Sequence, residues 1–113
     1  MIYRIMIIED DAVIREELKT LLCGNGYEVQ CVTDFGDPVG EVKRWQPHLI
    51  LLDINLPGEN GFRLCSGIRA FSEVPIIFVT SRNTDMDELN SIMLGGDAFI
   101  SKPYHVAILL ARI

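Results

Sequence analysis

The sequence predicts an α/β fold in which helices cover both faces of a parallel β-sheet. Short apolar runs rich in β-branched residues alternate five times with segments that have the periodicity of amphipathic helices. The central runs are apolar throughout, which is typical of strands buried on both sides. The chain has 113 residues, the size of one ordinary domain, so we expect a single core and one domain over residues 1–113.

Five short runs are predicted to form the strands. In chain order they are Ile5–Ile8, Glu28–Val32, Leu49–Leu52, Ile76–Val79 and Ala98–Ile100. The apolar first run invites comparison with a membrane span or a signal peptide. It is too short for a span, lacks a small-residue cleavage site, and leads directly into Glu9 and Asp10. We therefore interpret it as a buried strand and expect no membrane segment.

Apolar residues at helical spacing occupy the intervals between the strands. From the first interval to the fourth, they are Ile14, Leu18, Leu21 and Leu22; Val39, Val42 and Trp45; Phe62, Leu64, Ile68 and Phe71; and Met86, Leu89, Ile92 and Met93. Residues that end helices follow three of these patterns, at Gly24, Pro47 and Gly95. A fifth helix is predicted to begin near Tyr104 and to be still running at Ile113 without a cap, so we expect the chain to be part of something longer.

Charge and cysteine content narrow the classes of function. Ten Lys and Arg residues against 16 Asp and Glu residues give a net charge of −6. Such a surface is a poor counterion for phosphate backbones, so this domain is not expected to bind nucleic acid itself. Cys23, Cys31 and Cys65 show no C-x-x-C spacing, which argues against a zinc site or a disulfide framework and is typical of the reducing cytoplasm.

Polar side chains follow four of the predicted strands. They are Glu9, Asp10 and Asp11 after the first strand, Asp53 and Asn55 after the third, Thr80 after the fourth, and Lys102 after the fifth. In open α/β sheets, ligands bind beyond the carboxyl ends of the strands. If these strands are neighbours, carboxylates, a hydroxyl and an ammonium group converge on one edge of the sheet.

Some of these residues have a simpler explanation. Asp11 precedes a helical pattern and is expected to cap that helix. A simple capping role explains Asp53 less well, because Asp53 directly follows a fully apolar strand. Clustered carboxylates repel one another unless a cation neutralises them, so Glu9, Asp10 and Asp53 together predict a site for an oxygen-ligated metal, with Mg²⁺ the natural choice. With that cation bound, the Asp53 carboxylate can act as a nucleophile toward a phosphoryl group.

The motifs Ile-Ile-Glu9-Asp10-Asp11, Leu-Leu-Asp53-Ile-Asn55-Leu-Pro-Gly, Val-Thr80-Ser and Ile-Ser-Lys102-Pro103 stand in the order and at the intervals that resemble the receiver domain of two-component response regulators. The resemblance covers essentially the whole chain. It implies a flavodoxin-like (βα)5 fold of three layers, with a five-stranded parallel sheet in the order 2-1-3-4-5. It also allows a cis peptide bond before Pro103.

The resemblance also implies residue roles, carried over by position. These are Glu9 and Asp10 as the acidic metal pair, Asp53 as phosphoacceptor and metal ligand, the backbone carbonyl of Asn55 as a further Mg²⁺ ligand, Lys102 as the phosphate-binding lysine, and Thr80 with Phe99 as the switch pair. The function implied is a cytoplasmic signalling switch rather than an enzyme. Asp53 accepts a phosphoryl group from the phosphohistidine of a sensor histidine kinase, and the domain assists its own Mg²⁺-dependent phosphotransfer and autodephosphorylation.

Within the family, the sequence most resembles the OmpR/PhoB type. That type implies a C-terminal winged-helix output domain, which would make the only contact with DNA and regulate transcription, and a homodimer through helix four, strand five and helix five. Glu88, Ala98 and Ile108 depart from the charged residues of that pairing surface. We therefore expect a weak or phosphorylation-dependent homodimer.

Other classes fit less well. A stand-alone adaptor receiver stays open. A Mg²⁺-dependent aspartyl-phosphate phosphatase of the haloacid-dehalogenase kind places a second Asp two residues after the nucleophile, where this chain has Asn55, whose amide cannot transfer protons. A flavodoxin needs a Ser/Thr/Gly phosphate loop after the first strand, where this chain has Glu9-Asp10-Asp11.

Overall fold

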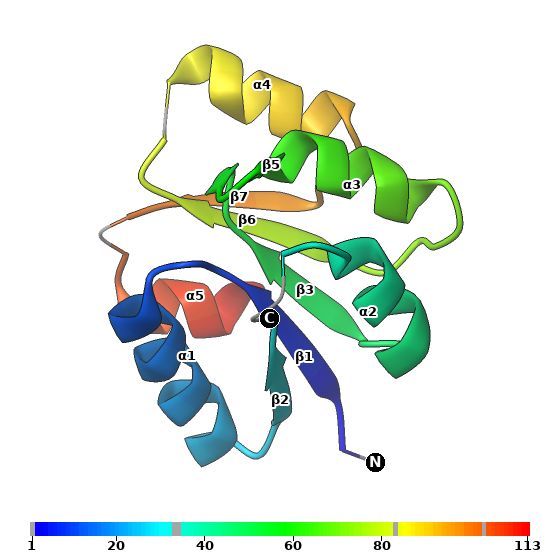
Figure 1. Ribbon diagram of the computed structural model, residues 1–113. Helices are drawn as coiled ribbons and strands as arrows, with labels where there is room; N and C mark the ends of the chain where they lie inside the picture. The colour runs from blue at the N-terminus through cyan, green and yellow to red at the C-terminus, as the bar shows by residue number, and fades with distance from the viewer. Residues whose placement is uncertain (1, 33–34, 83, 103) are drawn as a thin grey trace.

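The computed structural model describes residues 2–32, 35–82, 84–102 and 104–113. Pro103, and with it the bond that the resemblance allows to be cis, lies outside these ranges. Along the chain the elements are β1 (Arg4–Ile8), α1 (Ala12–Gly24), β2 (Glu28–Cys31), α2 (Pro38–Trp45), β3 (Leu49–Leu52), β4 (Asn55–Leu56), β5 (Glu59–Asn60), α3 (Gly61–Arg69), β6 (Ile76–Thr80), α4 (Asp85–Met93), β7 (Ala98–Ser101) and α5 (Val106–Arg112) (Figure 1). Among the described residues, no helix combines the length and the apolar character needed to cross a membrane.

Five of the strands form one parallel sheet in the order β2-β1-β3-β6-β7. Counted among themselves, these are strands 2-1-3-4-5, so the predicted flavodoxin-like order is confirmed. The predicted strand bounds are correct to within one residue. Ile8 of β1 is paired with Leu52 of β3, so the residues that follow these two strands leave the sheet side by side.

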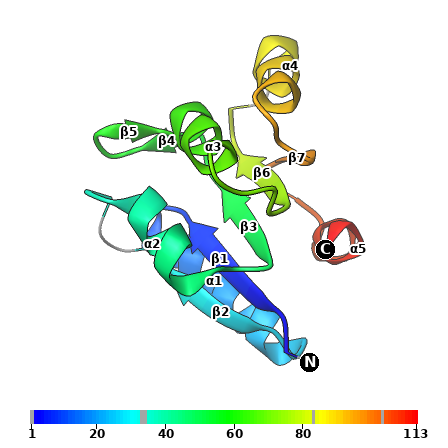
Figure 2. The same cartoon turned by 90° about the vertical axis from the view of Figure 1, so that its right-hand side faces the viewer.

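The two faces of the sheet bury different helices. Because successive side chains of a strand point to opposite faces, Ile5 and Ile7 of β1 contact one cluster and Met6 and Ile8 the other. The first cluster includes Leu18 and Leu22 of α1 and Leu109 of α5; the second includes Val42 of α2 and Phe62, Leu64, Cys65 and Ile68 of α3. Figures 1 and 2 show the resulting three layers, with α1 and α5 on one side of the sheet and α2, α3 and α4 on the other.

Helix α4 forms where the sequence predicts it, but its apolar residues do not face the sheet. Met86 and Ile92 are 62% and 57% exposed, and Leu89 is exposed as well. The residues of α4 that are buried are Asp87 and Ser91. The helix is therefore held by polar contacts and by its ends, and it presents an apolar stripe to solvent.

Helix α5 begins at Val106, later than the predicted start near Tyr104. His105 has an extended backbone, and its carbonyl oxygen accepts hydrogen bonds from the backbone N–H groups of Ile108 and Leu109. Helical hydrogen bonding therefore starts at His105, which leaves Tyr104 outside the helix and free to line the carboxyl edge of the sheet.

A two-stranded hairpin, which the sequence did not predict, follows β3. Asn55 pairs with Asn60 and Leu56 with Glu59, and the turn between them is Pro57-Gly58. Gly58 has φ +64°, the left-handed conformation that the second central residue of a type II turn requires. The hairpin carries the chain from the carboxyl edge of the sheet back to α3.

An Arg69–Asp97 network joins α3 to the amino ends of β6 and β7. Asp97 Oδ2 accepts from the backbone N–H of Ile76 at 2.8 Å and from Arg69 Nη2 at 3.0 Å. Arg69 also donates to the carbonyl oxygens of Val74 at 2.7 Å and Gly95 at 2.9 Å. The Arg69–Asp97 ion pair therefore satisfies backbone groups in the segments that precede β6 and β7 and at the start of β6.

Replacing Asp97 with Ala should lower the free energy of unfolding by about 1–3 kcal/mol, because the Ile76 N–H loses its acceptor and Arg69 its counter-charge. Asp97→Asn should cost less, since the amide oxygen can still accept from Ile76. Urea denaturation with linear extrapolation measures both values. Equal losses for the two variants would contradict the importance of the backbone acceptor.

Candidate functional site

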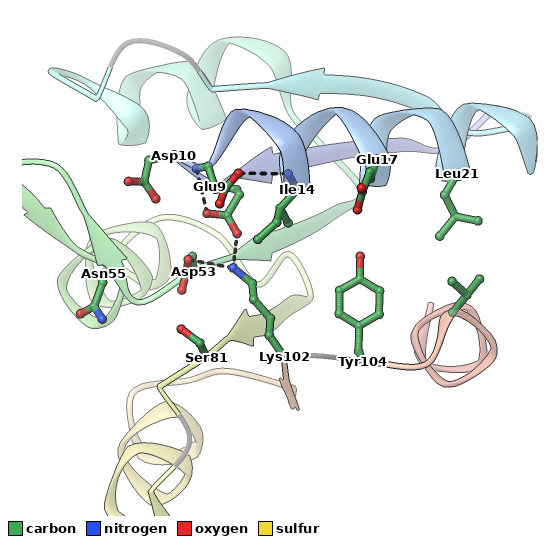
Figure 3. Close-up of a pocket in the computed structure, with 12 residues that line it drawn as sticks. Glu9, Asp10, Ile14, Glu17, Leu21, Asp53, Asn55, Ser81, Lys102 and Tyr104 are labelled. Atoms are coloured by element: carbon green, nitrogen blue, oxygen red, sulfur yellow. Dashed lines mark hydrogen bonds and ion pairs between the residues drawn. The ribbon is translucent and has the colours of Figure 1, made fainter.

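Five of the seven predicted site residues meet at the carboxyl edge of the sheet, beside a cavity of about 800 Å³. Glu9, Asp10, Asp53, Asn55 and Lys102 all line this cavity. They come from the end of β1, from the stretch that runs from the end of β3 into β4, and from the end of β7, so three separate stretches of chain supply one site (Figure 3). The prediction that these residues converge is confirmed.

Three carboxylates lie together because of the register of β1 and β3. The backbone N–H of Asp53 donates to the carbonyl oxygen of Ile8 at 3.0 Å, which places Asp53 beside Glu9. Carboxylate oxygens of Glu9, Asp10 and Asp53 lie within 4.8 Å of one another. Glu9 is 3% and Asp53 8% exposed, whereas Asp10 is exposed. Asp11 instead caps α1, accepting from the backbone N–H groups of Val13 and Ile14 as predicted.

Lys102 supplies the positive charge among these carboxylates. Its Nζ donates to Asp53 Oδ2 at 3.1 Å and to Glu9 Oε1 in a direct ion pair. Figure 3 shows the side chain extending from the end of β7 toward both acids. Sequence reasoning assigned Lys102 to a phosphate and did not foresee its contact with Glu9, because no local pattern links residues so far apart in the chain.

The electrostatic balance of the cluster follows from burial and from this lysine. Burial raises the pKa of Glu9 to about 7, and the hydrogen bond from Lys102 opposes that effect. Burial acts to lower the pKa of Lys102, but its contacts with Glu9 and Asp53 outweigh burial and raise that pKa above its ordinary value. Lys102 therefore remains an ammonium ion, and it offsets only part of the negative charge.

The donor set fits a hard divalent cation. All three side chains offer carboxylate oxygens, two of them are buried, and the third opens the group to solvent. Mg²⁺ prefers oxygen ligands from one or two carboxylates and retains several waters, which suits an open edge. Glu9, Asp10 and Asp53 are the residues that would hold such an ion.

Gly61 at the start of α3 fixes the position of the Asp53 backbone. Its N–H donates to the carbonyl oxygen of Ile54 at 2.7 Å. A Cβ atom at this position would lie 2.1 Å from the carbonyl oxygen of Asp53, so only glycine permits this approach. The Asp53 carboxylate is held further by a 2.7 Å hydrogen bond from the backbone N–H of Ile54 to Oδ1.

Thr80 and Phe99, the predicted switch pair, lie beside the site without entering it. Thr80 ends β6 and is fully buried, and its Oγ1 accepts from the backbone N–H of Arg82 at 3.1 Å. Of these two neighbouring residues, both of which the structure describes, Ser81 lines the cavity and Thr80 does not. Phe99 is half-buried and packs against the cluster on the α2 and α3 face. Their switch roles stay predictions.

The cavity extends beyond the residues that the sequence indicated. Between α1 and the segment before α5, it is lined by Ile14, Glu17, Leu21, Tyr104 and Val106. Figure 3 shows Tyr104 and Asn55 on opposite sides of Asp53. These wall residues lack a local signal, since their spacing is that of any amphipathic helix packed on a sheet.

The chain matches a known protein family over almost its whole length. A family model described as the response regulator receiver domain matches residues 5–113. The chain belongs to this family. It is 41% identical over 111 residues to the sensory transduction protein BceR of Halalkalibacterium halodurans, covering 98% of this chain and 48% of that protein. It is 40% identical over 111 residues to the transcriptional regulatory protein YvcP of Bacillus subtilis, covering 98% of this chain and 47% of that one.

Solved receiver domains have the same fold. The BeF3-activated N-terminal receiver domain of Klebsiella pneumoniae RstA superposes with a TM-score of 0.92 at 32% identity, covering 96% of this chain and 93% of that one. The N-terminal domain of the nisin resistance regulator NsrR superposes with a TM-score of 0.88 at 44% identity, covering 97% and 93%. The chain is thus a receiver domain rather than a haloacid-dehalogenase phosphatase or a flavodoxin, and it spans about half the length of the curated relatives it matches.

Replacing Lys102 with Met should tighten Mg²⁺ binding roughly fivefold or more, because the ammonium group repels the ion and competes for Glu9 and Asp53. Isothermal titration at about pH 9, where carboxyl groups are ionised, measures the affinity. Lys43→Met is the matched control. Lys43 is in the last turn of α2, where its ammonium group lies over the Phe71 ring, so this variant should leave the affinity for Mg²⁺ unchanged. Weaker binding by Lys102→Met would show that the lysine orders the carboxylates rather than competing for them.

Proposed function

We propose that Asp53 of this receiver domain accepts a phosphoryl group from the phosphohistidine of a sensor histidine kinase. The observation that supports this most directly is the setting of the Asp53 carboxylate at the carboxyl edge of the sheet. It accepts a hydrogen bond from the backbone N–H of Ile54, lies 3.1 Å from Lys102 Nζ and has two further acids beside it. A lone buried carboxylate would repel a phosphoryl group. One accompanied by an ammonium group and a divalent-ion site can receive it.

In the proposed step, a carboxylate oxygen of Asp53 attacks the phosphorus atom of the phosphohistidine. The new O–P bond forms as the P–N bond breaks, and its electron pair leaves with the imidazole, which departs neutral because its other nitrogen carries a proton. The product is an acyl phosphate on Asp53. Attack by water on that phosphorus later returns the carboxylate and inorganic phosphate, which is the proposed autodephosphorylation.

The neighbouring residues stabilise different oxygens of the phosphoryl group. Lys102 exchanges its contact with Asp53 for one with a phosphoryl oxygen, and Thr80 supplies a hydroxyl to another. Mg²⁺ bound by Glu9, Asp10, Asp53 and the carbonyl oxygen of Asn55 would supply the positive charge that phosphoryl transfer needs. To reach the site, the Thr80 hydroxyl must give up the hydrogen bond it accepts from Arg82. We propose this exchange, with a rotamer change of Phe99, as the start of the switch.

The output of the switch lies outside this chain in our proposal. The relatives named as transcriptional and sensory transduction proteins are about twice as long as the aligned region. We propose that the whole protein is a cytoplasmic regulator of the OmpR/PhoB type, with a winged-helix domain that contacts DNA. A stand-alone adaptor receiver is the alternative.

The face formed by α4, β7 and α5 is the proposed pairing surface. It carries the exposed apolar stripe of α4, which includes Leu89 and Ile92, and a further exposed apolar residue, Ile108, on α5. Its charged contacts are few, because Asp97 is already engaged by Arg69 within the same chain. Exposed ion pairs contribute only about 0–1 kcal/mol each, so apolar contact must supply most of the association energy, at roughly 25 cal/mol per Å².

Incubation with acetyl phosphate and Mg²⁺ should add one phosphoryl group, seen by intact mass spectrometry and removed by hydroxylamine as expected of an acyl phosphate. Asp53→Asn should abolish labelling, because an amide is not a nucleophile at neutral pH. Excess EDTA should also prevent it. Asp85→Asn, an exposed carboxylate on α4, is the control and should label normally. Labelling of Asp53→Asn, or undiminished labelling in EDTA, would refute the assignment.

The 113-residue chain should sediment as a monomer or a weak dimer at micromolar concentration, because Glu88, Ala98 and Ile108 leave its pairing surface with few ion pairs. Pairing should strengthen in the complete protein once it is phosphorylated. Analytical ultracentrifugation with and without a beryllofluoride phosphate mimic makes the comparison. A tight dimer of the unphosphorylated chain would mean that the apolar stripe alone is sufficient for association.

A further inference from the structure

Arg82, in the segment between β6 and α4, has contacts that the proposed function does not use. Its Nε donates to Asp87 Oδ1 of α4 at 3.0 Å. Its Nη1 donates a longer hydrogen bond, 3.4 Å, to Asn55 Oδ1 of β4. The guanidinium carbon lies 5.6 Å from the centre of the Phe62 ring of α3, within the range of a cation–π contact. One side chain thus joins three elements beside the phosphorylation site.

Asp87 holds Arg82 in this position. It is only 5% exposed, and its carboxylate accepts hydrogen bonds from Thr84, the N-cap of α4, and from Arg82. Its Oδ2 accepts from Thr84 Oγ1 at 2.8 Å and from the Thr84 backbone N–H at 3.3 Å, which completes the capping box of the helix. Although burial acts to raise the pKa of Asp87, the bonds from Thr84 and the charge of Arg82 lower it. Asp87 therefore stays ionised and paired.

The bond from Arg82 orients the amide of Asn55. With Oδ1 occupied by a guanidinium donor, the Asn55 NH₂ group is the part of the amide left to meet a ligand. Asn55 lines the same cavity as Asp53 (Figure 3). An amide turned the other way would present its oxygen, which repels the oxygens of a phosphoryl group.

We propose that Arg82 and Asp87 are a pair of positioning residues that couple the first turn of α4 to the phosphorylation site by presenting the Asn55 amide nitrogen to a phosphoryl group on Asp53. This inference rests on the proposed phosphorylation of Asp53. The coupling is reciprocal: a phosphoryl group that engages Asn55 stabilises the Arg82–Asp87 contact, and a shift of α4 that breaks the contact withdraws the Asn55 donor.

Neutral substitutions of two residues with opposite charges separate this coupling from a simple effect of local charge. The measurement is the rate constant of Asp53 phosphorylation by acetyl phosphate with Mg²⁺. If charge alone matters, Arg82→Met slows labelling by an anionic donor and Asp87→Asn accelerates it. If the pair positions Asn55, both variants slow labelling about twofold to tenfold, the effect of losing one hydrogen bond. In the double variant the rate should equal that of Arg82→Met alone, because Asp87 acts through Arg82.

Arg44 and Asp37 provide the matched control. They form an Arg–Asp pair at 3.6 Å, and Asp37 caps α2 as Asp87 participates in the cap of α4, but neither lines the cavity. Arg44→Met and Asp37→Asn should leave the labelling rate unchanged. If Asp87→Asn labels as fast as wild type or faster while wild type is labelled on Asp53, the coupling is wrong and the phosphorylation proposal survives. If wild type takes no label, the phosphorylation proposal itself fails.

A second variant covers the case in which Asp87→Asn does not fold. Arg82→Lys keeps the charge but cannot donate from two separate nitrogens to Asp87 and Asn55. Under the proposed coupling it labels as slowly as Arg82→Met. A wild-type rate for Arg82→Lys would overturn the coupling, because charge would then be sufficient.

Discussion

The structure is organised around the crowding of three carboxylates at one edge of a parallel sheet. The register of β1 and β3 forces Glu9 and Asp53 together, and burial makes their mutual repulsion stronger than it would be in water. Lys102 is the internal counter-charge, and a divalent cation held by Glu9, Asp10 and Asp53 would be an external one. Because Lys102 offsets only part of the negative charge, the site favours the approach of a further cation.

The fold holds the backbone of the site firmly and helix α4 loosely. The Asp53 backbone is held by the sheet and by the close approach of Gly61, so the nucleophile has little freedom. Helix α4 has no large apolar side chain in either core cluster and is attached by Asp87, Ser91 and its ends. Elements with few buried apolar contacts open at low free energy, so α4 is the element best suited to move when the charge of the site changes.

Polar contacts connect these two parts. The backbone N–H of Arg82 donates to the Thr80 hydroxyl oxygen, and the Arg82 side chain donates to both Asn55 and Asp87. Any rearrangement of the Thr80 hydroxyl toward a phosphoryl group therefore affects the segment that also carries Arg82. The exposed apolar stripe of α4 lies on the same helix as Asp87, at the end of this series of contacts.

Much of this molecule follows from the sequence alone. Apolar runs and helical periodicity predicted every strand of the main sheet to within one residue, and charged residues directly after the strands located the site, because the carboxyl ends of parallel strands must share an edge. Periodicity could not show that α4 turns its apolar residues outward, because rotation of a helix about its axis depends on its neighbours. Nor could it show the β4–β5 hairpin, the contact of Lys102 with Glu9, or the Arg82–Asp87 pair. The Lys102–Glu9 contact joins residues 93 positions apart, which no local pattern links. The hairpin and the Arg82–Asp87 pair are close in the chain, but strands of two residues are too short to show periodicity, and an ion pair depends on side-chain placement, which only the folded structure decides.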